Sequence, residues 1–277
     1  MKIEMRETSH PQEFKVYNTD RIRQEFLIQN LFEPDEISLA YSFYDRMVAG
    51  GVCPVKPLEL TAHKELGTQF FLERREMGVI NVGPEGKITV DGSDYSLART
   101  EGLYIGKGAK NVTFASLDPA KPAHFYVLSA PAHQTLPTEK IDPGDAETVE
   151  LGTPEQSNVR TLRKYIHPDG AKSCQLCMGM TTVQSGSVWN SMPCHTHGRR
   201  MEVYFYFDLP GDSVLFHLMG QPDETRHIVV RNEEAVISPN WSIHAGAGTG
   251  SYSFIWGMIG ENQVFSDMDA VEMADLR

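Results

Sequence analysis

The sequence contains few of the features that mark secreted, membrane or nucleic-acid-binding proteins. It has only 4 cysteines in 277 residues, which excludes a disulfide framework. No apolar run approaches the roughly 20 residues that a membrane-spanning helix needs, and residues 1–7 contain no apolar signal core. The chain carries 25 basic and 37 acidic residues, and this net charge of -12 argues against nucleic acid or anionic membrane as partners. We therefore expect a cytoplasmic protein that acts on a small molecule.

Cofactor fingerprints are also scarce. There is no Gly-x-Gly-x-x-Gly motif and no P-loop, so the sequence does not predict a nucleotide cofactor. Cys174 and Cys177 form one C-x-x-C pair, but no second pair is present to complete a zinc ribbon. We interpret the two cysteines as structural thiols, with a redox or metal role as the alternative.

Helical signals are confined to the N-terminal part of the chain. Asn18 and its neighbours can cap a helix that continues to about Leu31, and a second short helix is predicted over residues 34–47. From about Leu58 the chain consists of short β-rich runs broken by Gly, Pro, Asn and Asp, with a good hairpin turn at residues 91–92. Many short strands at regular spacing predict an all-β-dominated sandwich or barrel, a class that includes jelly rolls.

The same pattern predicts four segments. Residues 1–57 form an N-terminal helical and extended segment, and residues 58–135 form a first barrel. Residues 136–155 are polar, contain prolines and are interpreted as a linker. Residues 156–277 form a second β-rich barrel.

The most informative motif lies in this second half, where His195-Thr196-His197 is followed by Glu202 and later by His244. Side chains two residues apart project from the same face of a β-strand, so the first two imidazoles can point to one place. Three imidazoles and one carboxylate are a plausible ligand set for a divalent transition metal.

The first half does not repeat this motif. When residues 101–108 are aligned on residues 234–241, Asn111 falls opposite His244. The same alignment places Ala62 and Lys64 opposite the two histidines of the His-x-His motif. We therefore expect a complete metal site only in the second barrel.

The spacing of the motif resembles the cupin superfamily. Cupins carry His-x-His, then three or four residues and a glutamate, and later Pro-x-Gly-x-x-His. Four residues separate His197 from Glu202, and Pro239 and His244 keep the second motif, with Trp241 in place of the glycine.

Longer strings resemble the 5-keto-4-deoxyuronate isomerase family over essentially the whole chain. They are residues 19–23, 193–197, 199–207, 221–227, 254–258 and 275–277. The resemblance implies a bicupin, with two jelly-roll β-barrels and short N-terminal helices, that is zinc-dependent and hexameric. It also implies that the zinc ligands are His195, His197, Glu202 and His244.

The function implied by the resemblance is an intramolecular oxidoreductase. It would convert 4-deoxy-L-threo-5-hexosulose uronate to 3-deoxy-D-glycero-2,5-hexodiulosonate in the breakdown of pectin and related uronates. The alternatives are 5-deoxyglucuronate isomerase of inositol catabolism, a non-catalytic metal-bearing sugar-binding cupin, and an iron-dependent dioxygenase.

A uronate substrate requires a cationic clamp for its carboxylate, and a ketol-isomerase requires a group that moves a proton. The sequence offers several substrate-binding candidates near the motif or on neighbouring predicted strands, namely Arg163, Gln175, Arg200 and Arg226. Lys164 and Tyr204 are candidates for a catalytic role. The alternation of side chains along the predicted strands does not select between them.

Overall fold

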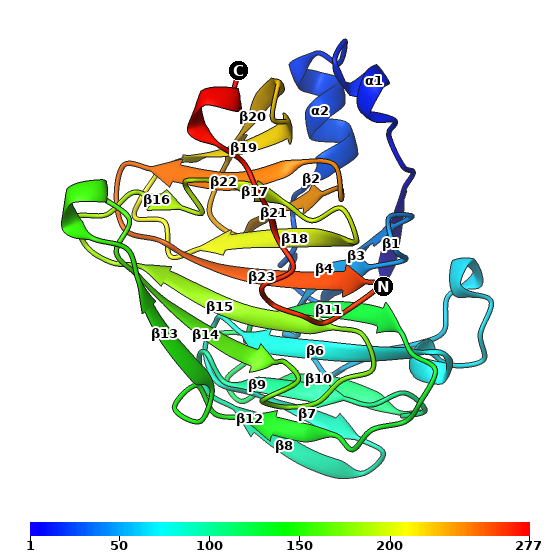
Figure 1. The fold of residues 1–277 in the computed structure, drawn as a ribbon. Helices are drawn as coiled ribbons and strands as arrows, with labels where there is room; N and C mark the ends of the chain where they lie inside the picture. Colours follow the sequence, from blue (N-terminus) through cyan, green and yellow to red (C-terminus); the bar gives the residue numbers. More distant parts are fainter. The chain divides into compact units, whose positions relative to one another are not determined.

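The computed structural model describes residues 1–277, and strands account for most of its regular structure (Figure 1). The chain divides into two compact units. Unit 1 comprises Met1–Met5, Asn30–Glu147 and Lys164–Met178, and unit 2 comprises Arg6–Gln29, Thr148–Arg163 and Gly179–Arg277. None of the helices has the length and apolar composition that a membrane crossing would need.

Unit 1 contains a seven-stranded and a four-stranded antiparallel sheet. In spatial order the larger sheet contains β1 (Lys2–Arg6), β3 (Glu36–Ser42), β4 (Val48–Cys53), β11 (Phe125–Pro131), β6 (Arg75–Asn81), β9 (Gly102–Ile105) and β12 (Glu139–Ile141). The smaller sheet contains β5 (Leu58–Glu59), β10 (Val112–Ser116), β7 (Gly86–Val90) and β8 (Ser93–Leu97). Two short 3-10 helices, η1 (Lys64–Leu66) and η2 (Phe71–Glu73), lie in the connections.

Alternation of side chains builds the core of unit 1. On β7 the apolar residues Ile88 and Val90 are buried while Lys87 and Thr89 between them are partly exposed. The hairpin predicted at residues 91–92 is confirmed, because Val90 pairs with Ser93 and both turn residues have positive φ, 47° and 88°.

Unit 2 repeats this arrangement of sheets. Its larger sheet contains β13 (Glu147–Leu151), β14 (Arg160–Ile166), β15 (Cys177–Val183), β23 (Ser253–Gly260), β18 (Arg200–Phe207), β21 (Glu234–Ser238) and β2 (Leu27–Ile28). Its smaller sheet contains β16 (Trp189–Asn190), β22 (Ile243–Gly248), β19 (Leu215–Gln221) and β20 (Glu224–Val230). A two-stranded sheet, β17 (His195–Thr196) with β24 (Asp269–Ala270), and the 3-10 helices η3 (Pro154–Gln156) and η4 (Met273–Asp275) complete it.

The two N-terminal helices are shorter than predicted, and only one of them lies where a helix was predicted. Helix α1 (Pro11–Phe14) is a single turn, and α2 (Thr19–Phe26) begins at Asn18, whose side chain accepts a hydrogen bond from the Arg21 N–H at 2.9 Å. The chain leaves the helix at Leu27 because Leu27 and Ile28 pair with β21. These tertiary contacts end the helix before the predicted Leu31.

The helix predicted over residues 34–47 is wrong, because strand β3 occupies Glu36–Ser42. From Glu36 to Leu39 partly exposed and buried residues alternate, which is the period of a strand. Strand β4, all of whose residues are buried, pairs with β3 and supplies hydrogen-bond partners for its backbone N–H and C=O groups.

The predicted segment boundaries also differ from the two units. Residues 30–57 contribute β3 and β4 to unit 1, while residues 6–29 belong to unit 2. The predicted linker, 136–155, contains the strands β12 and β13. Short edge strands of this kind give little sequence signal, because the sheet that they join supplies most of their stabilisation.

No cysteine forms a disulfide bond, as predicted. Cys177 is buried at the start of β15, whereas Cys174 precedes the strand and its Sγ atom lies 3.0 Å from Nδ1 of His133. The two thiols of the C-x-x-C pair therefore have different surroundings and do not share a strand.

Candidate metal centre

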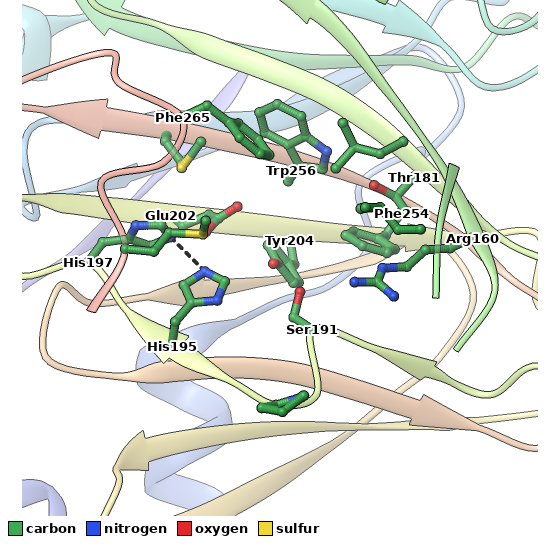
Figure 2. Close-up of a pocket in the computed structure, with 15 residues that line it drawn as sticks. Arg160, Thr181, Ser191, His195, His197, Glu202, Tyr204, Phe254, Trp256 and Phe265 are labelled. Atoms are coloured by element: carbon green, nitrogen blue, oxygen red, sulfur yellow. Dashed lines mark hydrogen bonds and ion pairs between the residues drawn. The ribbon is translucent and has the colours of Figure 1, made fainter. Parts of the chain in front are cut away.

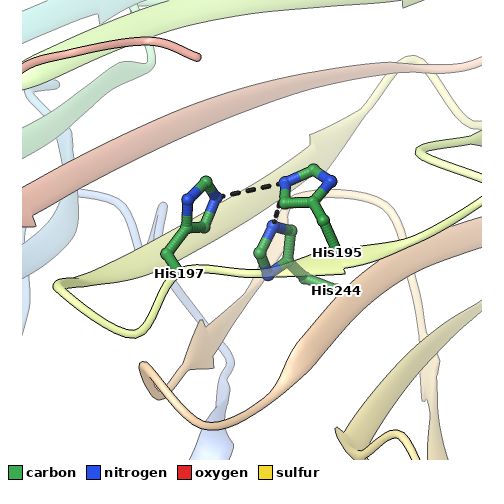
Figure 3. Close-up of side chains that lie close together, drawn as sticks. All are labelled: His195, His197 and His244. Carbon is green, nitrogen blue, oxygen red and sulfur yellow. Dashed lines mark hydrogen bonds between the residues drawn. The ribbon is translucent and has the colours of Figure 1, made fainter. Parts of the chain in front are cut away.

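Four side-chain atoms of unit 2 converge on one point. Nε2 of His195 lies 3.1 Å from Nε2 of His197 and 3.0 Å from Nε2 of His244 (Figure 3). Oε2 of Glu202 lies 3.2 Å from Nε2 of His197 and 3.0 Å from Nε2 of His244. The structure thus brings together all four residues that the sequence predicts as ligands.

Three neighbouring backbone segments position these atoms. His195 lies on β17 and His197 follows it, Glu202 lies on β18, and His244 lies on β22. Within the sheets, Glu202 pairs with Ser238 of β21 and His244 pairs with Met219 of β19. Because the ligands come from strands that are fixed by hydrogen bonding, their positions depend little on side-chain flexibility.

Burial keeps the imidazoles of His195 and His244 neutral, which is the form that binds a metal. Burial, with the nearby His197 and Arg200, lowers the pKa of His195 to about 3. Burial and the adjacent imidazoles hold the pKa of His244 well below its usual value. Both side chains therefore offer unprotonated nitrogen at neutral pH.

The other ring nitrogens of two of the histidines have polar partners. Nδ1 of His197 lies 3.1 Å from the main-chain oxygen of Asp267, which can only accept, and 3.0 Å from Nη2 of Arg200, which can only donate. The tautomer that leaves Nε2 free for a metal is the one in which Nδ1 donates to the Asp267 oxygen. Nδ1 of His244 lies 3.3 Å from Oγ of Ser238. Such partners orient a histidine for metal binding and raise its basicity as a ligand.

The donor set fits a divalent transition metal. The three imidazole nitrogens and the carboxylate oxygen form four neighbouring pairs with distances of 3.0–3.2 Å. Without a cation between them, their lone pairs would face each other, which is unfavourable. Imidazole and carboxylate ligands suit zinc, iron, manganese and nickel.

The centre opens into a cavity of about 210 Å³ within unit 2 (Figure 2). Most of its wall is apolar, and a few polar side chains interrupt it. The lining residues are Leu151, Arg160, Leu162, Thr181, Ser191, Pro193, His195, His197, Glu202, Tyr204, Phe254, Trp256, Met258, Phe265 and Met268. A mostly apolar cavity with a few convergent polar groups is typical of a small-molecule site.

A family model described as KduI/IolB matches residues 26–274 of the chain. The chain belongs to the KduI/IolB family. Family members named 4-deoxy-L-threo-5-hexosulose-uronate ketol-isomerase are similar over the full length. One from Lachnoclostridium phytofermentans is 56% identical and one from Escherichia coli is 54% identical, and in both comparisons 99% of this chain and 100% of the relative are covered.

Solved structures support the fold of this family member. An IolB-like protein from Salmonella typhimurium LT2 has a TM-score of 0.71 at 15% identity, with 86% of this chain and 94% of that chain covered. Bacillus subtilis oxalate decarboxylase, whose Mn(II) centres have been characterised, has a TM-score of 0.55 at 9% identity, with 81% and 71% covered. The predicted bicupin fold is confirmed.

The corresponding strand pair of unit 1 has different side chains. Met77 pairs with Ile105 there, and the alignment of the two halves places Ile105 opposite Ser238, with which Glu202 pairs in unit 2. A thioether thus stands in the place of the carboxylate. The other group of possible ligands, Glu147, His167 and Asp169, lies in unit 1, where Lys164 pairs with Glu147 at 2.9 Å.

Arg200 has a different place from the one predicted. Its side chain is 1% exposed and does not line the cavity. Its Nη1 donates to the main-chain oxygen of Val264 at 2.8 Å, and its Nη2 donates to that of Asp267 at 2.6 Å. Arg200 therefore holds the segment that carries Phe265 and Met268 over the cavity, and it supports His197 through Asp267.

The other predicted substrate contacts also lie outside the cavity wall. Arg226 pairs with Glu224 at 2.7 Å and donates to the Lys15 oxygen at 2.8 Å. Gln175, in unit 1, donates to the Pro131 oxygen at 3.0 Å. Arg163 lies on β14 and is not among the lining residues.

Of the two catalytic candidates, only Tyr204 lines the cavity. Burial and the nearby Glu202 raise the pKa of Tyr204 well above its usual value, so its hydroxyl keeps its proton. Its ring centroid lies 5.3 Å from that of His244. Lys164 instead pairs with Glu147 in unit 1.

The sequence prediction missed four polar residues of the wall, namely Arg160, Thr181, Ser191 and Trp256. Arg160 and Leu162 lie two apart on β14 and both line the cavity, whereas Arg163 does not. Side chains two residues apart on a strand point to the same side. Had Leu162 been taken to face the interior, this rule would have predicted that Arg160 faces the interior too.

Proposed function

We propose that this chain is a metal-dependent ketol-isomerase that converts 4-deoxy-L-threo-5-hexosulose uronate to 3-deoxy-D-glycero-2,5-hexodiulosonate. The observation that carries the proposal is the convergence of His195, His197, Glu202 and His244, the first three of which line a mainly apolar cavity. Full-length relatives at 52–56% identity that bear the name of this activity support it.

The reaction needs no redox cofactor. The aldehyde at C1 becomes an alcohol and the alcohol at C2 becomes a ketone, so a hydrogen moves from C2 to C1 and the substrate is neither oxidised nor reduced overall. Negative charge collects on the two oxygens as the C2 proton leaves. A divalent metal at the four ligands would polarise the carbonyl and stabilise this charge.

The residues of the cavity supply the remaining requirements. Tyr204 holds its phenolic proton beside the ligands and can donate a hydrogen bond to a substrate oxygen. Phe254, Trp256 and Phe265 surround the cavity with apolar surface, which excludes water and strengthens electrostatic interactions inside it. Glu202, as a ligand, is unsuited to the role of free base.

Zinc, a homohexameric assembly, cytoplasmic location and a place in pectin breakdown belong to the same proposal. The family resemblance supports zinc, the hexamer and the place in pectin breakdown, and the nitrogen and oxygen donors of the site suit zinc. Metal analysis of the purified protein and its mass by light scattering test the first two.

A substrate panel tests the activity. The purified protein is assayed with 4-deoxy-L-threo-5-hexosulose uronate and with 5-deoxyglucuronate, and oxygen consumption is followed in parallel. We expect turnover of the first substrate with a higher kcat/KM and no oxygen uptake. Preference for 5-deoxyglucuronate would support the inositol-pathway isomerase, oxygen uptake would support a dioxygenase, and binding without turnover would support a sugar-binding cupin.

A further inference from the structure

Arg160 is a partly buried cation in the cavity wall without a carboxylate partner. Its Nη1 donates to the main-chain oxygen of Asn158 at 2.8 Å, and Tyr204 lines the same cavity. Arg226, outside the cavity, has a carboxylate partner. Removing a cation from water without an anion is unfavourable, so a ligand that carries a negative charge would stabilise this arrangement.

Two further polar groups of the wall have no partner. Nε1 of Trp256 and Oγ1 of Thr181 make no hydrogen bond, although the two residues are only 3% and 1% exposed. An unsatisfied buried polar group costs about 1–3 kcal/mol, and an indole N–H can only donate. An acceptor oxygen in the cavity would satisfy the indole, and the Thr181 hydroxyl can donate to the same group.

Packing fixes the Trp256 ring in this position. A Cβ atom at Gly179 would lie 2.1 Å from Cζ2 of Trp256 and 2.5 Å from the main-chain oxygen of Arg163. The absence of a side chain at residue 179 therefore lets the indole lie flat against β15. Its N–H direction is set by the fold before any ligand binds.

Arg160 and Thr181 lie at the opposite end of the cavity from the metal ligands, with Trp256 between. Figure 2 shows His195, His197 and Glu202 at one end and Arg160 and Thr181 at the other. Tyr204 lies between the two ends, and its ring centroid lies 5.3 Å from that of His244. The cavity therefore offers a metal centre and a cationic, hydrogen-bond-donating end.

We propose that Arg160, Thr181 and Trp256 form the subsite for the substrate carboxylate, an assignment that rests on the proposed function. The reacting carbons of the uronate are C1 and C2, and its carboxylate is C6 at the other end of the same chain. A substrate whose aldehyde end lies at the metal ligands thus has its carboxylate far from them. The metal ligands and Arg160 lie at different ends of the cavity (Figure 2), and guanidinium and N–H donors match the charge of a carboxylate.

Three variants with a matched control test the subsite in the metal-loaded protein. They are Arg160→Gln, Trp256→Phe and Thr181→Val, and the control is Arg23→Gln. Arg23 is also half-buried and donates to a main-chain oxygen, that of Val229 at 2.8 Å, but it lies outside the cavity. Circular dichroism and metal content show whether each variant folds and keeps its metal.

For Arg160→Gln we expect KM for the uronate to rise about 10- to 100-fold with a smaller change in kcat, because a charge-assisted hydrogen bond is lost. Trp256→Phe and Thr181→Val each lose one neutral donor, and KM should rise about 5-fold. Arg23→Gln should behave as wild type. A KM within 2-fold of wild type in folded, metal-loaded Arg160→Gln would overturn the assignment.

A binding measurement separates this inference from the proposed activity. D-galacturonate and the uncharged D-galactose are titrated calorimetrically into wild type and Arg160→Gln. We expect wild type to bind the acid more tightly than the neutral sugar and the variant to lose this preference. If wild type shows the preference and turns over no uronate, the proposed activity fails and the subsite stands. If the variant keeps the preference, the subsite fails whatever the activity.

Discussion

Nδ1 of His197 and Nη2 of Arg200 meet at a single main-chain oxygen, that of Asp267, at 3.1 Å and 2.6 Å. A buried arginine and a metal-site histidine thus share one acceptor. The arrangement gives Arg200 a positioning role, because it fixes the carbonyl that in turn fixes the imidazole.

Arg200→Gln should therefore weaken metal binding. Loss of an outer partner of a ligand commonly costs 10- to 100-fold in metal affinity, and we expect a loss of about that size. Competition against a chelator of known affinity measures it. Arg199→Gln is the control, since Arg199 is exposed and pairs with Asp267 and Asp269 at the surface. An unchanged metal affinity in the Arg200 variant would remove its positioning role.

His244→Ala should lose metal and activity together while the protein remains folded. The imidazole faces the other ligands and not the apolar core, so its removal opens the metal site without a large loss of packing. Elemental analysis, activity and circular dichroism are measured on one preparation. Full metal content with full activity would show that His244 is not a ligand.

Tyr204→Phe should lower kcat and leave the metal in place. The change removes only a hydroxyl, and positioned proton donors contribute about 10²–10⁴-fold to rate. We expect kcat to fall at least about 100-fold with metal content equal to wild type. A kcat close to that of wild type would show that another group supplies the proton.

His217 should make the protein less stable in mild acid. Burial lowers the pKa of His217 to about 3, and its Nδ1 is 2.8 Å from the Tyr206 hydroxyl. The unfolded chain takes up a proton near pH 6.5 and the folded chain does not, so stability falls as pH falls from about 6.5 toward 3. The contribution amounts to about 2 kcal/mol between about pH 7 and pH 5.

Urea unfolding of the metal-free protein at these two pH values, at one protein concentration, measures this loss. His217→Gln cannot take up the proton and should lose about 2 kcal/mol less than wild type over the same interval. The other histidines titrate in both proteins and cancel in the comparison. Equal losses would mean that His217 is protonated in the folded state.

The metal centre could be predicted from the sequence because its chemistry is carried by residue types in a fixed spacing. His195 and His197 are two residues apart and Glu202 follows at a set distance, so the motif can be recognised without knowledge of the tertiary structure. The all-β class was predictable for a similar reason, since alternation on strands such as β7 is a local property.

The substrate end of the cavity could not be predicted in the same way. Arg160, Arg163 and Arg200 are all arginines on strands, and only tertiary packing shows that Arg160 faces the cavity while Arg200 holds main-chain oxygens. Strand β3 was mistaken for a helix because its pairing with β4, and not local propensity, determines its conformation.

Metal removal followed by restoration tests the central claim most directly. The protein is analysed for metal and assayed on 4-deoxy-L-threo-5-hexosulose uronate as purified, after chelation, and after return of the ion found. We predict about one transition metal per chain, loss of turnover in proportion to metal removed, and recovery on its return. Full turnover by a folded, metal-free protein would contradict the account.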